Sequence, residues 1–364
     1  MRKINVIALI FVLLLCIPFA AGKAEAGEDI YEILDQQGDT VTFFAGTPEA
    51  GDEYIAGDNG HYRVTQVDNE GRKARAEYLG SYEMPDVQWA SESAQPVSAA
   101  KKAVALYCTH SDESYEPTDG SSSIQKRGGI YDVAESLKAD LEKQGITVYY
   151  SDENHYPHDA GAYRRSRSTA ASLAEEGVDA IFDVHRDGIP DAGQYESRVD
   201  GEDVTKVRLL VGRSNQNADA NKQFAVQIKA VADQVYPGLI KDIYIGKGTY
   251  NQDLMSQAVL LEFGTHKSDK NEVLASTAYM ADVLNRTLYG GVTGAAGEGK
   301  SGAARENSGG WTGAAWLVGV LLIGMLIYAL LATGNGRLAA QKWKRNFQEM
   351  SGGLFGRRGH KDGK

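Results

Sequence analysis

The sequence predicts an α/β fold: a mostly parallel sheet flanked by helices, preceded by a small β-rich domain and followed by a C-terminal transmembrane helix. Three observations predict this arrangement. Between residues 101 and 290, apolar runs typical of strands alternate with helical patterns, as in layered α/β domains. Residues 27–85 show short alternating segments separated by turns, and residues 311–333 are apolar and carry no charge.

The two ends of the chain predict its location. A basic segment, an apolar run and small residues make residues 1–26 a secretory signal peptide, with an uncleaved N-terminal anchor as the alternative. Residues 311–333 reach the ~20 residues needed to cross a bilayer. Because the tail at 334–364 is basic and positive residues stay in the cytoplasm, we predict a single C-terminal span in the cell membrane with the body on the extracytoplasmic side.

The segment after the signal peptide predicts a small β domain over residues 27–85. Its expected strands are 40–44, 53–56, 61–67 and 73–79. Residues 86–100 are rich in Ser, Ala, Gln and Pro, which is typical of a linker. A domain boundary near residue 98 follows.

The largest domain is expected over residues 101–290. Its expected strands are 102–107, 146–150, 179–184, 206–211, 242–245 and 258–262. Apolar residues at helical spacing predict one helix that includes Val133 to Leu141 and ends before Gly145. They predict another that includes Phe224 to Val235 and ends before Pro237. Residues 291–310, dominated by Gly, Ala and Ser, predict a flexible tether to the membrane span.

Three of the expected strands end in side chains that can bind metal or move protons. His110 follows the strand at 102–107, His185 ends the strand at 179–184, and Glu262 ends the strand at 258–262. Side chains at strand ends are held by rigid backbone beside a cleft. Two imidazoles and a carboxylate in these places predict a zinc site with Glu262 as its general base or transition-state stabiliser.

The third protein ligand is open on the residues alone. Glu113 lies three residues after His110, and this spacing followed by a distant histidine resembles that of zinc carboxypeptidases. His155 or His158 is an alternative ligand from a polar loop. Because Glu262 follows four apolar residues, we expect partial desolvation to raise its pKa.

Four further residues are candidates for substrate binding or for support of the metal ligands. Arg186 and Asp187 adjoin His185 and could orient it or bind a substrate carboxylate, although a surface ion pair is an equal alternative. His158 and Asp159 are the other two candidates. His266 could reach the rim of the cleft.

Charge and cysteine content exclude some classes. The formal net charge of -11 does not favour nucleic-acid binding. After signal removal Cys108 is the only cysteine, so no internal disulfide is possible, and we expect this residue to be a small buried hydrophobe.

Four motifs, in order along residues 100–285, resemble the stage II sporulation protein P group of bacterial cell-wall hydrolases. They are Tyr107–Pro117, His158–Asp159 followed by Tyr163–Arg167, Asp183–Asp187, and Asn251–Leu254 leading to Leu261–Gly264. The resemblance implies a zinc N-acetylmuramoyl-L-alanine amidase fold acting on peptidoglycan. Some members of the group also cleave peptide cross-links. The resemblance further implies that the protein acts together with stage II sporulation proteins D and M during engulfment of the forespore.

The same resemblance assigns roles to residues. It implies that His110 and His185 bind zinc and that Glu262 is the catalytic acid or base. Related amidases place a ligand glutamate just before the helix after the first histidine, but residues 124–127 here contain none. We therefore choose Glu113 over Asp119 as the third ligand.

Two other functions remain open at this point. A catalytically idle wall-binding scaffold that recruits another hydrolase would explain the missing glutamate near Gln125. A zinc carboxypeptidase acting on wall peptides would share the metal site and differ in the bond that it cuts.

Overall fold

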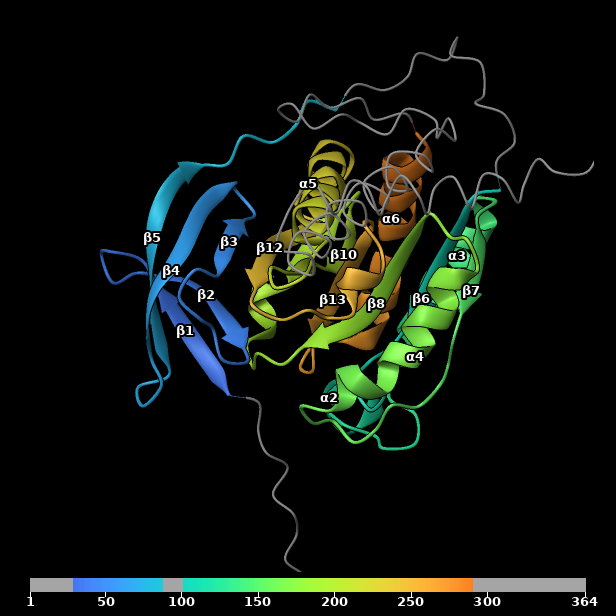
Figure 1. Cartoon of the computed structure of the whole chain (residues 1–364), viewed down its shortest axis with the longest axis horizontal. Helices are drawn as coiled ribbons and strands as arrows, with labels where there is room; N and C mark the ends of the chain where they lie inside the picture. The colour runs from blue at the N-terminus through green and yellow to red at the C-terminus, as the bar shows by residue number, and fades with distance from the viewer. Residues whose placement is uncertain (1–28, 88–100, 291–364) are drawn as a thin grey trace, which may run out of the picture. The chain divides into compact units, whose positions relative to one another are not determined.

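In the part of the chain that the structure describes, the main sheet has eleven strands, in the order β2-β1-β5-β4-β3-β12-β11-β13-β8-β6-β7 (Figure 1). The structure is a computed structural model and describes residues 29–87 and 101–290. Six of the strands come from the predicted α/β domain. They are β6 (Ala103–Tyr107), β7 (Thr147–Tyr150), β8 (Ala180–Asp187), β11 (Val207–Gly212), β12 (Ile240–Gly246) and β13 (Ala258–Thr265).

These six strands confirm the prediction of a mixed α/β fold with a mostly parallel sheet. Strands β7, β6, β8 and β13 run parallel to one another, and β11 runs parallel to β12. The single antiparallel pairing joins β11 to β13, so β11 and β12 run opposite to the other four. The carboxyl ends of β6, β8 and β13 therefore lie at the same edge of the sheet.

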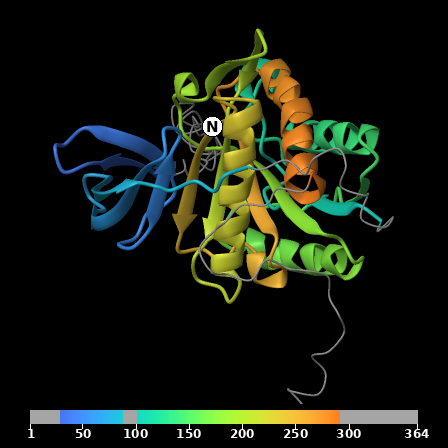
Figure 2. The ribbon, with the colours of Figure 1, turned by 90° about the horizontal axis from the view of Figure 1, so that it is seen from above.

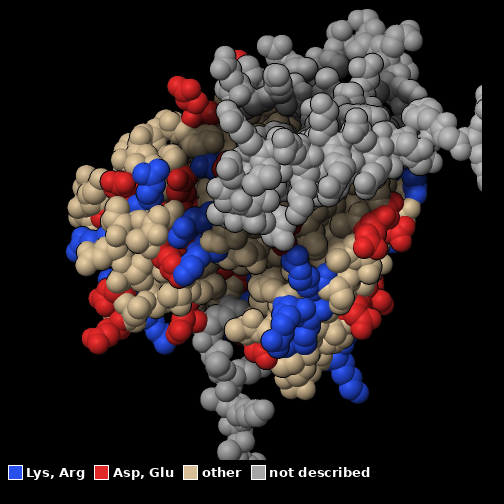
Figure 3. All heavy atoms as spheres, viewed as in Figure 1, with Lys and Arg blue, Asp and Glu red and all other residues tan. Residues whose placement is uncertain are grey.

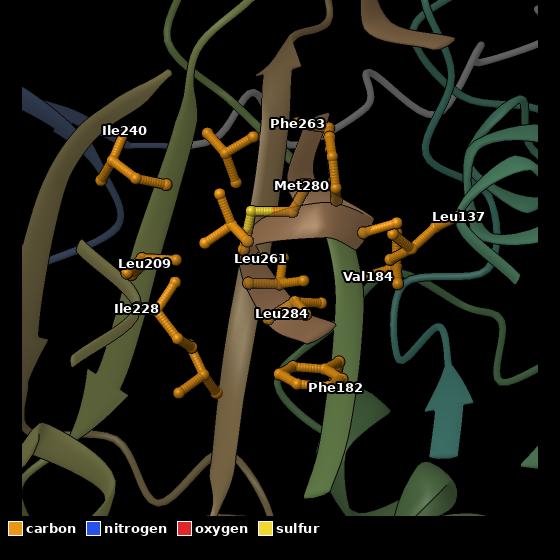
Figure 4. Packing of buried hydrophobic residues seen from close by; sticks show 14 of the residues in the cluster. Leu137, Phe182, Val184, Leu209, Ile228, Ile240, Leu261, Phe263, Met280 and Leu284 are labelled. Carbon is orange, nitrogen blue, oxygen red and sulfur yellow. The ribbon is translucent and has the colours of Figure 1, made fainter. Parts of the chain in front are cut away.

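Helices cover both faces of the sheet. They are α2 (Glu116–Asp119), α3 (Ile130–Lys143), α4 (Ala162–Glu175), α5 (Ala218–Val235) and α6 (Lys270–Tyr289). Alternation along β6 shows the two faces: Val104 and Leu106 join the cluster that holds α3, α5 and α6, whereas Ala103 and Ala105 pack with α4. Figure 4 shows part of the larger cluster, where Leu261 and Phe182 of the sheet face the helices.

The N-terminal strands continue the same sheet. They are β1 (Ile30–Leu34), β2 (Thr40–Ala45), β3 (Glu53–Ala56), β4 (Gly60–Asp68) and β5 (Lys73–Ser81). Strand β3 pairs with β12, with Tyr54 opposite Tyr244. This pairing places the N-terminal strands, blue in Figures 1 and 2, next to β12. Their core includes Leu210 and Leu260 of the α/β part. The segment that we expected to form a small β domain thus shares a sheet and a core with the larger domain.

Several short elements were not expected from the sequence, among them β1 and α2. A hairpin of β9 (Glu196–Val199) and β10 (Glu202–Thr205) contacts α6, where Ser276 Oγ accepts a hydrogen bond of 3.0 Å from the Thr205 amide. The other unexpected elements are two 3-10 turns, at Ala192–Gln194 and Gln252–Leu254. The polar composition of the hairpin strands hides their pattern, because both faces carry charged residues.

The predicted signal peptide (1–26), tether (291–310), transmembrane helix (311–333) and tail (334–364) lie outside the described residues, as does most of the linker predicted at 86–100. In residues 29–87 and 101–290, none of the helices combines the length and the apolar character that a membrane crossing requires.

A charged contact between β3 and α5 leads to a pH-dependent prediction. Burial would raise the pKa of Glu53, but hydrogen bonds with Lys222 (2.6 Å) and His61 (3.1 Å) lower it to about 2. A carboxylate whose pKa falls on folding stabilises the protein above its unfolded pKa of about 4.3, and this stabilisation is lost as the pH falls toward 2. We expect Glu53→Gln to lower the free energy of unfolding by about 1 kcal/mol at pH 6.

Urea unfolding of wild type and variant between pH 6 and pH 2.5 measures this effect. The difference between the two proteins should shrink as the pH falls. Glu77→Gln is the matched control, because Glu77 faces Arg63 at 3.8 Å and is 43% exposed. A difference for Glu53→Gln that stays constant with pH would contradict the assignment.

Candidate metal centre

The site lies at the shared carboxyl edge of β6, β8 and β13. His110 follows β6 after a two-residue step, His185 belongs to the last half of β8, and Glu262 belongs to β13. In the sheet register Glu262 lies directly opposite His185. Parallel strands therefore place residues distant in sequence on neighbouring positions of one sheet face.

Two histidines and one glutamate form the candidate metal cluster. Oε1 of Glu113 lies 3.2 Å from Nδ1 of His110 and 3.3 Å from Nδ1 of His185. The ligand atoms that the three residues offer all lie within 4.8 Å of one another. Tetrahedral zinc with bonds of about 2.0–2.1 Å separates its ligand atoms by about 3.3–3.4 Å. Two of the contacts thus match the edges of a zinc tetrahedron.

Glu113 is fixed by the backbone around it. It is 2% exposed, and its Oε2 accepts a hydrogen bond of 2.9 Å from the backbone amide of Arg186. Asp119, the alternative weighed against it, instead accepts a hydrogen bond of 2.9 Å from the Tyr115 amide and contacts Lys270. Gln125 lies where the resemblance expects a glutamate, and its carbonyl accepts a hydrogen bond from Asn154.

The second nitrogen of His185 faces a buried carboxylate. Nε2 of His185 lies 3.0 Å from Oδ1 of Asp183, which also accepts a hydrogen bond of 2.8 Å from the Thr109 amide. A carboxylate on the far nitrogen of a histidine holds its ring and raises its strength as a metal ligand. Asp183 precedes His185 by two residues, so the alternation of β8 places both on one face.

The electrostatics of the cluster suit a bound cation. Burial would raise the pKa of Glu113, but His185, His110 and Arg186 hold it well below its ordinary value, so the carboxylate is ionised. Burial would lower the pKa of His185, yet Asp183 and Glu113 raise it well above the usual range. Two buried carboxylates therefore favour a positive charge at the position where a divalent metal would lie.

The pKa of Glu262 is shifted in the opposite direction from that of Glu113. Burial, followed by the charge of Asp187, raises the pKa of Glu262 to about 8, as the sequence led us to expect. The strand pairing is irregular between Glu262 and Thr265, where Gly264 has φ 65°. Such a bulge turns the strand and aims the side chain before it. A carboxyl group whose pKa lies near neutral pH can both accept a proton and return it during a reaction.

A buried arginine connects Glu262 to the rest of the sheet. Arg208 is 0% exposed and lies opposite Glu262 on β11, with Nη1 3.7 Å from Oε2 of Glu262. It donates hydrogen bonds to Asp242 (2.7 Å) and Asp187 (2.9 Å). On the N-terminal side, its Nη2 donates to Oγ1 of Thr42 on β2 at 3.0 Å.

Removing the Arg208 charge is expected to destabilise the protein strongly. Arg208→Met leaves buried Asp187 without its cationic partner and leaves Asp242 with only Lys241, 2.6 Å away, which costs about 3–5 kcal/mol in the free energy of unfolding. Arg198→Met is the control, because the Arg198 pair with Asp203 is 65% and 63% exposed and its loss costs less than about 1 kcal/mol. Urea unfolding measures the free energy of unfolding of both variants. Equal decreases in the two variants would show that the buried network stabilises the protein no more than an exposed ion pair does.

The other predicted residues have distinct positions. The ring of His158 stacks on that of His110 at 3.8 Å, and its Nδ1 lies 3.3 Å from Oδ1 of Asp112. Arg186 is buried and supports Glu113 through its backbone amide. Asp187 belongs to the buried network, accepting hydrogen bonds from Arg208 and, at 2.7 Å, from the hydroxyl of Tyr195.

Asp159 and the remaining histidines lie apart from the cluster. Asp159 is 52% exposed and pairs with Arg165 of α4. Basic side chains form a group in the same region of the surface, in the lower part of Figure 3. Both ring nitrogens of His155 are used, by the Cys108 carbonyl (2.8 Å) and the Thr169 hydroxyl (2.9 Å). Nε2 of His266 lies 4.0 Å from Glu116. Cys108 is buried, as predicted.

Four residues that complete the site were assigned no role from the sequence, although two of them, Asp183 and Tyr163, belong to the four sequence motifs. They are Asp183, Tyr163, Tyr195 and Arg208. A charged residue inside an apolar strand is a signal for the first and the last of these, because such a charge needs a buried partner. The two tyrosines carry no charge that would indicate a role, since only the folded chain places Tyr163 against His110 and Tyr195 beside Glu262.

Fold and site together define a class: an α/β protein with a candidate metal centre at the carboxyl ends of its parallel strands. Residues 49–285 match the family model described as stage II sporulation protein P. The chain belongs to that family.

Individual relatives cover about half of the chain. Stage II sporulation protein P of Bacillus subtilis (strain 168) is 28% identical over 208 residues, which are 52% of this chain and 52% of the relative. The chain thus matches about half the length of this curated relative.

Two solved structures show lower identity. The CwlD amidase from Clostridioides difficile, in complex with the GerS lipoprotein, is 11% identical with a TM-score of 0.34, over 52% of this chain and 95% of that one. The N-acetylmuramoyl-L-alanine amidase AmiC2 of Nostoc punctiforme is 15% identical with a TM-score of 0.29, over 52% and 96% of the two chains.

Proposed function

We propose that this protein is a zinc-dependent N-acetylmuramoyl-L-alanine amidase that hydrolyses peptidoglycan. The observation that carries the proposal is the convergence of His110, Glu113 and His185 opposite Glu262. Membership of the stage II sporulation protein P family supports a cell-wall substrate and a role in sporulation. Cleavage of peptide cross-links is a second activity that the sequence resemblance implies.

The residues of the chain divide the chemistry among them. Zinc, when bound by the two histidines and Glu113, supplies Lewis-acid polarisation of the amide carbonyl and activation of water. Glu262 accepts the proton of the attacking water and delivers it to the nitrogen of the departing L-alanine. Asp183 lies 3.0 Å from the far nitrogen of His185, and Arg208 (3.7 Å) and Tyr195 (3.5 Å) lie beside the carboxyl group of Glu262.

The proposed cellular setting follows from the ends of the chain and from the family. We propose that the protein is anchored in the cell membrane by residues 311–333, with the hydrolase body outside the cytoplasm. Stage II sporulation proteins D and M are the proposed partners during engulfment of the forespore. None of the chemistry in the site depends on which end of the chain is anchored.

Digestion of purified peptidoglycan by the full-length chain tests the proposal. Mass spectrometry of the products should show free L-alanine amino termini and unsubstituted N-acetylmuramic acid, and chelation should stop the reaction until zinc is restored. Products that lose only a terminal amino acid would identify a carboxypeptidase instead. Absence of zinc together with absence of products would identify an idle wall-binding scaffold.

A further inference from the structure

A cavity of about 480 Å³ lies between the connection from β2 to β3 and the loop after β12. Phe44, Glu49 and Asp52 of the N-terminal strands and their connection line one side. Lys247 and Tyr250, from the loop after β12, line the other. The cavity therefore exists because β3 pairs with β12 and brings the two segments together.

The walls of this cavity are well fixed. The ring of Phe44 stacks on that of Tyr244 at 4.0 Å with an angle of 7° between the planes. Asp52 is 2% exposed and accepts hydrogen bonds of 2.8 Å from Nε of Arg213 and from the Glu49 amide. Since Asp52 and Arg213 satisfy each other, the charges left to meet a ligand are those of Glu49 and Lys247.

Tyr250 connects the cavity to the metal centre. The ring of Tyr163 lies 5.5 Å from the ring of His110 and 5.3 Å from that of Tyr250. Tyr250 and Asn251 both have left-handed backbones, with φ 48° and 55°, and the Asn251 side chain holds the loop by donating to the Tyr163 carbonyl at 3.2 Å. Left-handed backbone at two successive non-glycine residues is costly and is concentrated at functional sites.

The mouth of the cavity carries an ion pair that a ligand can replace. Glu49 and Lys247 contact each other from the two walls and are 44% and 59% exposed. An exposed pair of this kind contributes little to stability, so opening it costs little. A ligand that carries an ammonium and a carboxylate on the same carbon would meet both charges at once.

We propose that this cavity binds the zwitterionic head of a diamino acid in the peptide of the substrate. The inference rests on the proposed amidase function, which places the first amide of that peptide at the metal centre. Three residues of extended peptide span about 10 Å. The rings of His110 and Tyr250 are separated by no more than the two ring contacts together, a span that three extended residues cover, so the third residue of the peptide can reach the cavity.

The test compares two substrates that differ in one carboxylate. Both are C-terminally amidated N-acetylmuramoyl tripeptides. In one the third residue is 2,6-diaminoheptanedioic acid, whose side chain ends in an ammonium and a carboxylate, and in the other it is lysine. For the wild-type chain we expect a KM on the order of fivefold lower for the first substrate. Lys247→Gln should bring the ratio of the two KM values to about one, and Glu49→Gln should raise both.

Arg198→Gln is the matched control, because Arg198 forms an exposed ion pair with Asp203 on the β9–β10 hairpin. It should keep the wild-type ratio. Equal KM values for the two substrates in the wild type, or an unchanged ratio in Lys247→Gln, would overturn the inference. If the wild type cleaves neither substrate, calorimetric binding of the two tripeptide amides without the muramoyl group still measures the ratio, now as Kd values, and separates failure of the cavity from failure of the amidase.

Discussion

Glu262→Gln is expected to lower kcat on peptidoglycan fragments by about 10²- to 10⁴-fold while zinc binding is kept. The amide has nearly the shape of the carboxyl group, but it can neither accept the proton of water nor return it to the leaving nitrogen. Glu262 is not among the three residues of the metal cluster, so metal content should stay at the wild-type level. Steady-state kinetics and metal analysis of the same preparation measure both effects.

Glu135→Gln is the control for this variant, since Glu135 is 50% exposed and pairs with Arg127 on the surface. It should have wild-type kcat. Retention of more than about a tenth of the wild-type kcat by Glu262→Gln would remove the proposed acid-base role from this residue.

His185→Ala is expected to abolish both zinc binding and hydrolysis, with activity reduced by at least about 10³-fold. The substitution removes one of three protein ligands and leaves Asp183 and Glu113 without the group that lies between them. Two remaining ligands hold zinc poorly, because a catalytic site needs three protein ligands and one open position. Metal analysis after dialysis and digestion of purified wall measure the two losses.

His61→Ala is the matched control, because His61 is a histidine of β4 that contacts Glu53 and lies outside the metal cluster. It should keep zinc and activity. Full activity in His185→Ala would end the proposed mechanism, whereas loss of activity with zinc retained would assign His185 a role other than that of a ligand.

Much of the fold could be predicted because the strands of the α/β part are buried on both sides. Strands such as β6 and β8 appear in the sequence as short, nearly continuous apolar runs, and helix α3 ends two residues before Gly145. The joining of β3 to β12 could not be predicted in the same way. It depends on pairing between residues far apart in sequence, and the four residues of β3 carry no mark of their partner.

The candidate site shows the same division. Polar residues at strand ends marked His110, His185 and Glu262, because a buried strand that stops at an ionisable residue is unusual. Glu113 lies close to both histidines because the chain turns tightly after β6. The three-residue spacing between His110 and Glu113 permits such a turn but does not require it. The partners of Arg208 depend on the register of three strands, and no local pattern contains that information.

The most direct test of the account is a crystal structure of the protein with zinc, with anomalous scattering data collected at the zinc absorption edge. We predict one strong peak at about 2.0–2.2 Å from a nitrogen of His110, a nitrogen of His185 and an oxygen of Glu113, on the side of the sheet where Glu262 lies. A peak bound to other residues, or no peak at these three side chains at saturating zinc, would contradict it.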